Sequence, residues 1–195
     1  MKPFSQACEN NKRPILEVLR RHLADVHELL EIGSGTGQHA VFFAAELPHL
    51  VWQPSDRREN HDGILAWIRE SGRDNVRPPL ELDVSDEPWP ITSTAAVFSA
   101  NTCHIMSWEE VVDFFTGVGR ILKPGGRFCL YGPFNYGGRY TSESNAVFDQ
   151  MLRRRDPLSG IRNLEDLDDQ AARAGLHQIE DNEMPANNRL LVWRK

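Results

Sequence analysis

Apolar residues in the first 135 positions follow two alternating spacings. Short continuous apolar runs, which are typical of buried strands, occupy residues 26–33, 50–56, 76–85, 95–105 and 127–134. Runs in which apolar residues recur every three or four positions, as in amphipathic helices, occupy residues 13–24, 38–47, 61–72 and 107–122. Strands that alternate with helices pair in parallel through crossover connections. The pattern therefore predicts a doubly wound α/β sheet.

Several of these elements carry end signals. Pro14 lies near the start of the first helix, and Gly72 closes the helix that begins at residue 61. Ser107 and Glu110 have the spacing of a capping box, which predicts that a helix starts there. The third strand is expected to end at Asp83.

After residue 135 the alternation breaks. A polar loop, "NYGGRYTSES", leads into two helix-like runs at 143–155 and 163–175. The extended runs 176–184 and 189–195, joined by "PANN", predict an antiparallel hairpin that completes a mostly parallel seven-stranded sheet at its edge. The chain shows no repeat or linker, so we expect a single domain over 1–195, with a helical cap at 1–25 and an insertion over the cleft at 135–162.

Composition excludes several classes of protein. The 195 residues carry a formal net charge of −6, which disfavours non-specific binding to nucleic acid or anionic membranes. No apolar run approaches the roughly 20 residues that span a bilayer, and no secretory signal is visible. The three cysteines form no CxxC pair and the histidines have no ligand spacing, so we expect a cytoplasmic protein without a metal site.

The segment "EIGSGTG" at 31–37 places three glycines directly after the first strand. Glycine adopts positive φ and lets the backbone approach a ligand, and ligands of such sheets bind at the carboxyl ends of the strands. A dinucleotide turn needs glycine or alanine three positions after its second glycine. That position is Gln38 here, which disfavours a nicotinamide-dependent oxidoreductase.

The glycine spacing, with Glu31 two residues before Gly33, resembles the first motif of class I S-adenosylmethionine-dependent methyltransferases. The segments "ENNKRPIL", "WQPSD", "YGPF", "SNAVFDQMLRRRDP" and "MPANN" further resemble a small methyltransferase-like family of unknown function shared by bacteria and animals. The resemblance implies a Rossmann-like methyltransferase fold and S-adenosylmethionine as cofactor. It leaves the acceptor open.

Carried onto this chain, the resemblance implies a cofactor site at the strand ends. Asp56 would accept the ribose hydroxyls, Asp83 and Val84 would contact the adenine, and Asn101 would face the methionine portion. The implied cofactor-binding residues are Glu31, Gly33, Ser34, Gly35, Gly37, Asp56, Asp83, Val84 and Asn101. Asn11 and Lys12, which precede the first strand, could reach the cofactor or could simply lie on the surface.

Methyl transfer from a sulfonium is an in-line displacement that needs a base only when the acceptor keeps a proton. His104 and Tyr136 are the candidate bases, and a structural hydrogen bond is the alternative for His104. Asn101 is not followed by the two prolines of amino-methylating nucleic-acid enzymes. We expect a methyltransferase acting on a small polar molecule or a protein side chain, with a catalytically silent cofactor-binding regulatory module as the alternative. The oligomeric state stays open.

Overall fold

The computed structural model describes residues 2–195. Its helices are α1 (Gln6–His22), α2 (Gln38–Glu46), α3 (His61–Ser71), α4 (Trp108–Ile121), α5 (Glu143–Arg155) and α6 (Leu164–Arg173), with 3-10 turns at Arg58–Asn60 and Pro185–Asn187. Its strands are β1 (Glu28–Ile32), β2 (Val51–Asp56), β3 (Leu80–Glu81), β4 (Thr94–Ala100), β5 (Leu122–Gly132), β6 (Phe134–Asn135), β7 (Arg162–Asn163), β8 (His177–Met184) and β9 (Asn188–Arg194).

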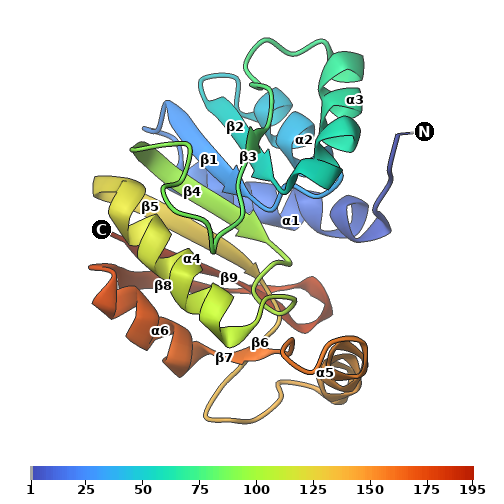
Figure 1. The fold of residues 1–195 in the computed structure, drawn as a ribbon, viewed down its shortest axis with the longest axis vertical. Helices are drawn as coiled ribbons and strands as arrows, with labels where there is room; N and C mark the ends of the chain where they lie inside the picture. Colours follow the sequence, from blue (N-terminus) through green and yellow to red (C-terminus); the bar gives the residue numbers. More distant parts are fainter. Residues whose placement is uncertain (1) are drawn as a thin grey trace.

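Seven of the strands form one twisted sheet in the order β3-β2-β1-β4-β5-β9-β8 (Figure 1). The first five pair in parallel, whereas β9 is antiparallel to both β5 and β8. The predicted doubly wound sheet with an antiparallel edge hairpin is confirmed. The strand order reverses between β1 and β4, so the carboxyl ends of these two strands border the crevice in which such sheets bind ligands.

Two helical layers cover the sheet. Helices α1, α2 and α3 lie on one face, and α4 and α6 lie on the other (Figure 1). Aromatic side chains fill both interfaces. The ring centroids of Phe43 and Trp52 lie 5.4 Å apart on the first face, and those of the stacked Phe128 and Trp193 lie 5.4 Å apart on the second. Helix α5 belongs to neither layer and stands beside the small β6–β7 pair (Figure 1).

The first helix is longer than its apolar pattern predicts. It begins at Gln6, after Ser5 caps it by accepting a hydrogen bond from the Cys8 N–H, and Pro14 lies inside it. The expected start at residue 13 is wrong because residues 6–12 are mostly polar and show no helical periodicity. Asn11 is nevertheless buried, since its side chain is hydrogen-bonded to His39 at 2.7 Å.

Two strands are shorter than expected. Strand β3 is only two residues long, because Pro78 and Pro79 before it have no N–H to donate to the ladder with β2, and Asp83 lies beyond its end. Strand β4 stops at Ala100, not at residue 105, because Asn101 adopts a left-handed φ of 59° and turns the chain out of the sheet.

The boundaries of α3 and α4 agree closely with the pattern, whereas those of β5 do not. The capping box of Ser107 and Glu110 starts α4, and Gly72 ends α3 in a left-handed conformation. Strand β5 covers Leu122–Gly132, so it begins five residues earlier than predicted and ends two residues earlier. No helix within residues 2–195 is long and apolar enough to cross a membrane.

Candidate functional site

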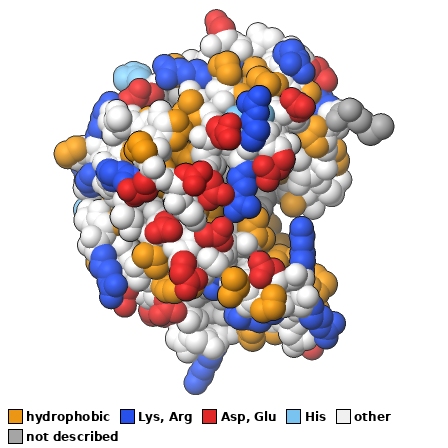
Figure 2. Space-filling model, viewed as in Figure 1, with side chains coloured by type: hydrophobic (Ala, Val, Ile, Leu, Met, Phe, Trp, Pro, Cys, Tyr) orange, Lys and Arg blue, Asp and Glu red, His pale blue; other side chains and the backbone are white. Residues whose placement is uncertain are grey.

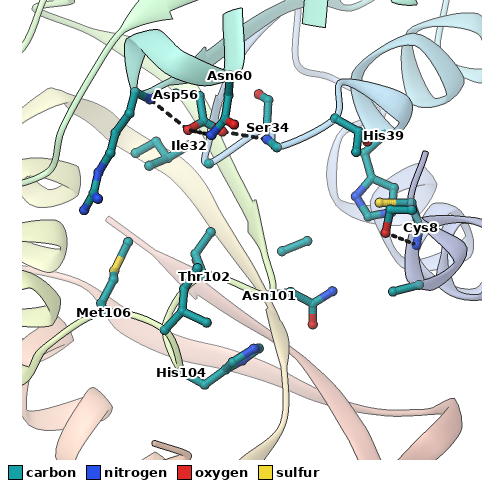
Figure 3. A pocket seen from close by; sticks show the side chains of 18 of the residues that line it. Cys8, Ile32, Ser34, His39, Asp56, Asn60, Asn101, Thr102, His104 and Met106 are labelled. Atoms are coloured by element: carbon teal, nitrogen blue, oxygen red, sulfur yellow. Dashed lines mark hydrogen bonds between the residues drawn. The ribbon is translucent and has the colours of Figure 1, made fainter. Parts of the chain in front are cut away.

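A cavity of about 590 Å³ opens at the carboxyl ends of β1, β2 and β4. Its walls come from the glycine-rich turn, the end of β2, the loop after β3, the loop after β4, the start of α1 and one residue of α5. This volume lies within the range of small-molecule sites. Figure 3 shows Asp56 and Asn60 at one end of the cavity and His104 at the other, with Met106, Thr102 and Asn101 between them.

The three glycines of the turn all have positive φ, at 74°, 55° and 87°, but for different reasons. A Cβ on Gly33 would lie 2.4 Å from Thr102 Cγ2, and one on Gly37 would lie 2.9 Å from the Cα of Ile64. A Cβ on Gly35 would meet no atom within 4 Å, and Gly35 lines the cavity. Internal packing therefore requires Gly33 and Gly37, whereas Gly35 leaves space for a ligand.

Glu31 supports the turn from behind. Its Oε2 accepts hydrogen bonds from Ser34 Oγ at 2.8 Å and from Trp52 Nε1 at 2.9 Å, and Ser34 Oγ in turn accepts the Ser55 N–H. Burial raises the pKa of Glu31 to about 7. Glu31 does not line the cavity, so its contact is with the turn itself.

Asp56 closes β2 and lines the cavity, although its side chain is largely buried. One carboxylate oxygen accepts the Gly35 N–H at 2.6 Å. The other accepts the Arg57 N–H at 2.8 Å and Asn60 Nδ2 at 2.7 Å. A carboxylate oxygen has two lone pairs, so the oxygen that faces Gly35 keeps capacity for a further donor.

The loop after β3 forms the adjoining wall. Asp83 and Val84 both line the cavity. An ion pair with Arg57 Nε at 2.9 Å holds the Asp83 carboxylate, and the same guanidinium reaches Glu110 at 3.1 Å. Val84 is buried and presents an apolar surface beside this ion pair. The wall thus combines a charged rim with an apolar patch.

The loop after β4 supplies the opposite end. Asn101 and His104 line the cavity, and the Asn101 N–H donates to Tyr131 O at 2.9 Å. The imidazole of His104 packs edge-on against Phe148 of α5, with ring centroids 5.3 Å apart. Burial, aided by the positive charge of Arg162, lowers the pKa of His104 to about 4, so the ring is neutral at pH 7.

Tyr136 lies elsewhere. Its hydroxyl donates to Asp181 at 2.8 Å, and it lines a separate groove with Arg189. Burial and the neighbouring Asp181 carboxylate raise its pKa. Of the residues predicted for the site, the cavity brings together Gly33, Ser34, Gly35, Asp56, Asp83, Val84, Asn101 and His104, and leaves out Glu31, Gly37 and Tyr136.

The start of α1, which belongs to the helical cap expected at 1–25, forms a further wall, but through residues that the sequence analysis did not name. Ser5, Ala7 and Cys8 line the cavity, whereas Asn11 and Lys12 do not. Gln38 holds this wall in place, because its side chain accepts the Ser5 N–H at 2.5 Å and donates to Glu9 at 3.0 Å. Gln38, which stands where a dinucleotide turn needs glycine or alanine, was the sequence feature that could have indicated this contact with the start of α1.

Other lining residues were also missed, among them His39, Asn60, Thr102 and Phe148. His39 is neutral at pH 7, because burial lowers its pKa to about 4. Cys103 is buried and its pKa is raised to about 12, so it is an unreactive thiol. Within residues 2–195 no group of three or more histidine, cysteine or acidic side chains is placed to hold a metal ion.

The family model described as "Protein of unknown function (DUF938)" matches residues 2–195. The chain belongs to the DUF938 family. Among curated proteins it is similar to the malonyl-[acyl-carrier protein] O-methyltransferase of Alcanivorax borkumensis, with 30% identity over 109 residues. That match covers 55% of this chain and only 35% of the relative.

Solved structures share the fold of this DUF938 protein. An S-adenosylmethionine-dependent methyltransferase, SibL, superimposes with a TM-score of 0.81 at 21% identity, covering 97% of this chain and 55% of SibL. Human N-acetylserotonin methyltransferase, solved with S-adenosylmethionine, gives a TM-score of 0.81 at 16% identity, covering 97% of this chain and 53% of the human one. The chain spans about half the length of these proteins. The expected methyltransferase fold is confirmed.

Proposed function

We propose that this DUF938 protein is an S-adenosylmethionine-dependent methyltransferase whose cofactor binds between the glycine-rich turn and Asp56. The observation that carries the proposal is the open space at Gly35 beside a largely buried carboxylate in the same cavity. A structural neighbour of this fold binds S-adenosylmethionine. We further propose that the chain is one methyltransferase-like domain that acts in the cytoplasm.

The residues present fit the chemical groups of this cofactor. The free lone pair on the Asp56 oxygen that faces Gly35 suits a ribose hydroxyl, because a carboxylate oxygen accepts two donors. Val84 offers an apolar contact for the adenine ring, and Asp83 an acceptor for its amino group. Asn101 supplies an amide at the far end of the turn, where the methionine portion would lie.

When bound, S-adenosylmethionine would supply a methyl group on a sulfonium for transfer to the acceptor atom. The chain's own contribution is to orient the acceptor, to exclude water and to receive any proton that the acceptor releases. His104 is the residue that we assign to the proton, since its neutral imidazole lines the cavity. Tyr136 faces a different groove and is set aside as a base.

The first test is cofactor binding by isothermal titration calorimetry. Asp56→Ala should weaken binding of S-adenosylmethionine and S-adenosylhomocysteine by roughly 10–100-fold, because a charged hydrogen-bond partner is lost. Asp62→Ala is the control, since Asp62 is exposed on α3 and does not line the cavity. Unchanged affinity in Asp56→Ala, or tight binding of NADH to the parent protein, would contradict the proposal.

A second test separates an enzyme from a silent cofactor-binding module. The purified protein is incubated with methyl-labelled S-adenosylmethionine and a metabolite extract, and label is followed into acceptors. Transfer by the parent protein that is lost in Asp56→Ala supports the methyltransferase. Cofactor binding without transfer to any acceptor would favour the regulatory module.

A further inference from the structure

Charge is distributed unevenly around the cavity. The charged side chains that line it are Asp56, Arg57, Glu59 and Asp83. Asp56 ends β2, Arg57 and Glu59 follow it, and Asp83 follows β3, so their backbones border the end that we assign to the cofactor. The wall formed by residues 100–106 and Phe148 contains no charged side chain. Figure 3 shows this second end, with His104 well separated from Asp56.

The uncharged end has apolar walls and opens to solvent. Ile105 and Phe148 line it together with Met106, and Ile105 is 57% exposed although it is a large aliphatic side chain. Figure 2 shows a notch in the molecular surface above α5, where hydrophobic side chains lie next to a Lys or Arg side chain. Adjoining apolar and aromatic side chains in the wall of a cavity are typical of small-molecule sites.

This end of the cavity is also held rigidly. The Arg162 guanidinium donates to the backbone carbonyls of Cys103 and Leu158, at 3.4 and 2.8 Å, and to that of Met106. Helix α5 is tied to the same region by Asp149, which accepts the Ile161 N–H at 2.6 Å. The loop after β4 and the helix that carries Phe148 are therefore joined before any ligand binds.

We propose that this end of the cavity binds the methyl acceptor, and that the acceptor is an uncharged molecule with an apolar body and a hydroxyl group that hydrogen-bonds to His104. The inference rests on the proposed methyltransferase function. Arg162 lies close enough to lower the pKa of His104, but it does not line the cavity, and its guanidinium donates to the backbone carbonyls of this loop. A carboxylate, phosphate or ammonium group placed at this end would therefore lose its hydration without a direct ion pair to residues 100–106 or Phe148. Asn101 and His104 are neutral hydrogen-bonding side chains, which suits a hydroxyl.

The test uses two probes of the same shape, 2-naphthol and 2-naphthoate, titrated near pH 7 into protein saturated with S-adenosylhomocysteine. Binding is followed by calorimetry and by the NMR shifts of the His104 ring. We expect 2-naphthol to bind at least about tenfold more tightly than 2-naphthoate, and to shift the His104 signals. Phe148→Ala should weaken 2-naphthol about tenfold through loss of an aromatic contact.

Val147→Ala is the matched control, because Val147 is the neighbouring residue on α5, is 53% exposed and does not line the cavity. It should leave both affinities unchanged. Equal or tighter binding of 2-naphthoate, no detectable binding of 2-naphthol, or equal losses in Phe148→Ala and Val147→Ala would each overturn the acceptor assignment. Failure of S-adenosylhomocysteine to bind would instead overturn the proposed function, so the two failures are distinct.

Discussion

Replacing Glu31 by glutamine should stabilise the protein relative to the parent, and this difference in free energy of unfolding should increase as the pH rises. Glu31 lies in β1 behind the glycine-rich turn, is 2% exposed and has no basic partner in its hydrogen-bond network. Both donors, Ser34 Oγ and Trp52 Nε1, bond to one and the same oxygen. The single carbonyl oxygen of glutamine can accept both bonds, so Glu31→Gln keeps the network and removes the charge.

The magnitude follows from the pKa of Glu31, which burial raises from 4.5 to about 7. Because the folded value is above the unfolded one, the folded protein retains a proton that the unfolded chain releases. Its contribution to stability is therefore fully present below pH 4.5 and is lost as the pH rises through about 7. At 1.36 kcal/mol per pKa unit, the full loss is about 3 kcal/mol.

The assay is chemical denaturation of the parent and Glu31→Gln proteins from about pH 5 to about pH 8. The difference in free energy of unfolding should grow in favour of Glu31→Gln by about 2–3 kcal/mol over this range. In thermal melts this corresponds to roughly 4–12 °C. The difference between the two proteins cancels the contributions that histidines and other groups common to both make to the pH dependence of the free energy of unfolding.

Glu28→Gln is the control, since Glu28 lies on the same strand but is partly exposed and pairs with Lys123. Such a pair contributes roughly 0–1 kcal/mol, so its removal should produce no comparable change with pH. If the difference between parent and Glu31→Gln stays constant from about pH 5 to about pH 8, Glu31 is ionised in the folded protein and the argument from burial is wrong.

Further predictions concern the turn and the proposed base. Gly33→Ala brings a Cβ within 2.4 Å of Thr102 Cγ2, so chemical denaturation should show a loss of about 2–4 kcal/mol. Gly35→Ala meets open space and should lose only about 1–2 kcal/mol while weakening cofactor binding; the reverse ranking of the two variants would refute this account. By NMR titration, His104 should stay neutral down to about pH 5, because its pKa is lowered to about 4; a midpoint near 6.5 would contradict its burial.

Much of the fold could be predicted from local patterns. The alternation of strand-like and helix-like runs was sufficient for the doubly wound sheet, and the capping box at Ser107 located the start of α4. The C-terminal hairpin followed from two extended runs around a short turn. These features depend on residues close together in the chain, so their physical signals survive in the linear sequence.

The predicted start of α1 and end of β4 are wrong, because these boundaries do not depend on the spacing of apolar residues. Residues 6–12 form two helical turns with few apolar positions, because Gln38 holds Ser5 and His39 pairs with Asn11 across to α2. No pattern within the helix itself announces those partners. The apolar run likewise predicts a strand as far as residue 105. The left-handed turn at Asn101 ends β4 at Ala100 instead, and the run itself gives no sign of this turn.

Some residues of the candidate site were likewise indicated by local sequence patterns, whereas others depend on tertiary contacts. Glycine spacing and the acidic residue at the end of β2 pointed to the turn and to Asp56, because in a parallel sheet the carboxyl ends of strands share one edge. Which glycine faces the cavity was decided by Thr102 and Ile64, which come from elsewhere in the chain. Tyr136 does not line the cavity, and its hydroxyl donates to Asp181 in β8. This contact forms only in the folded chain.

The division of charge within the cavity likewise belongs to the folded chain. Phe148 lies 44 positions after His104 in the sequence, yet their rings are in contact. Apolar periodicity depends on chain geometry and sets the elements and their order. The lining of a cavity depends on which side chains meet when distant elements pack, so its charge, its rigidity and its preference for a ligand are properties of the tertiary structure.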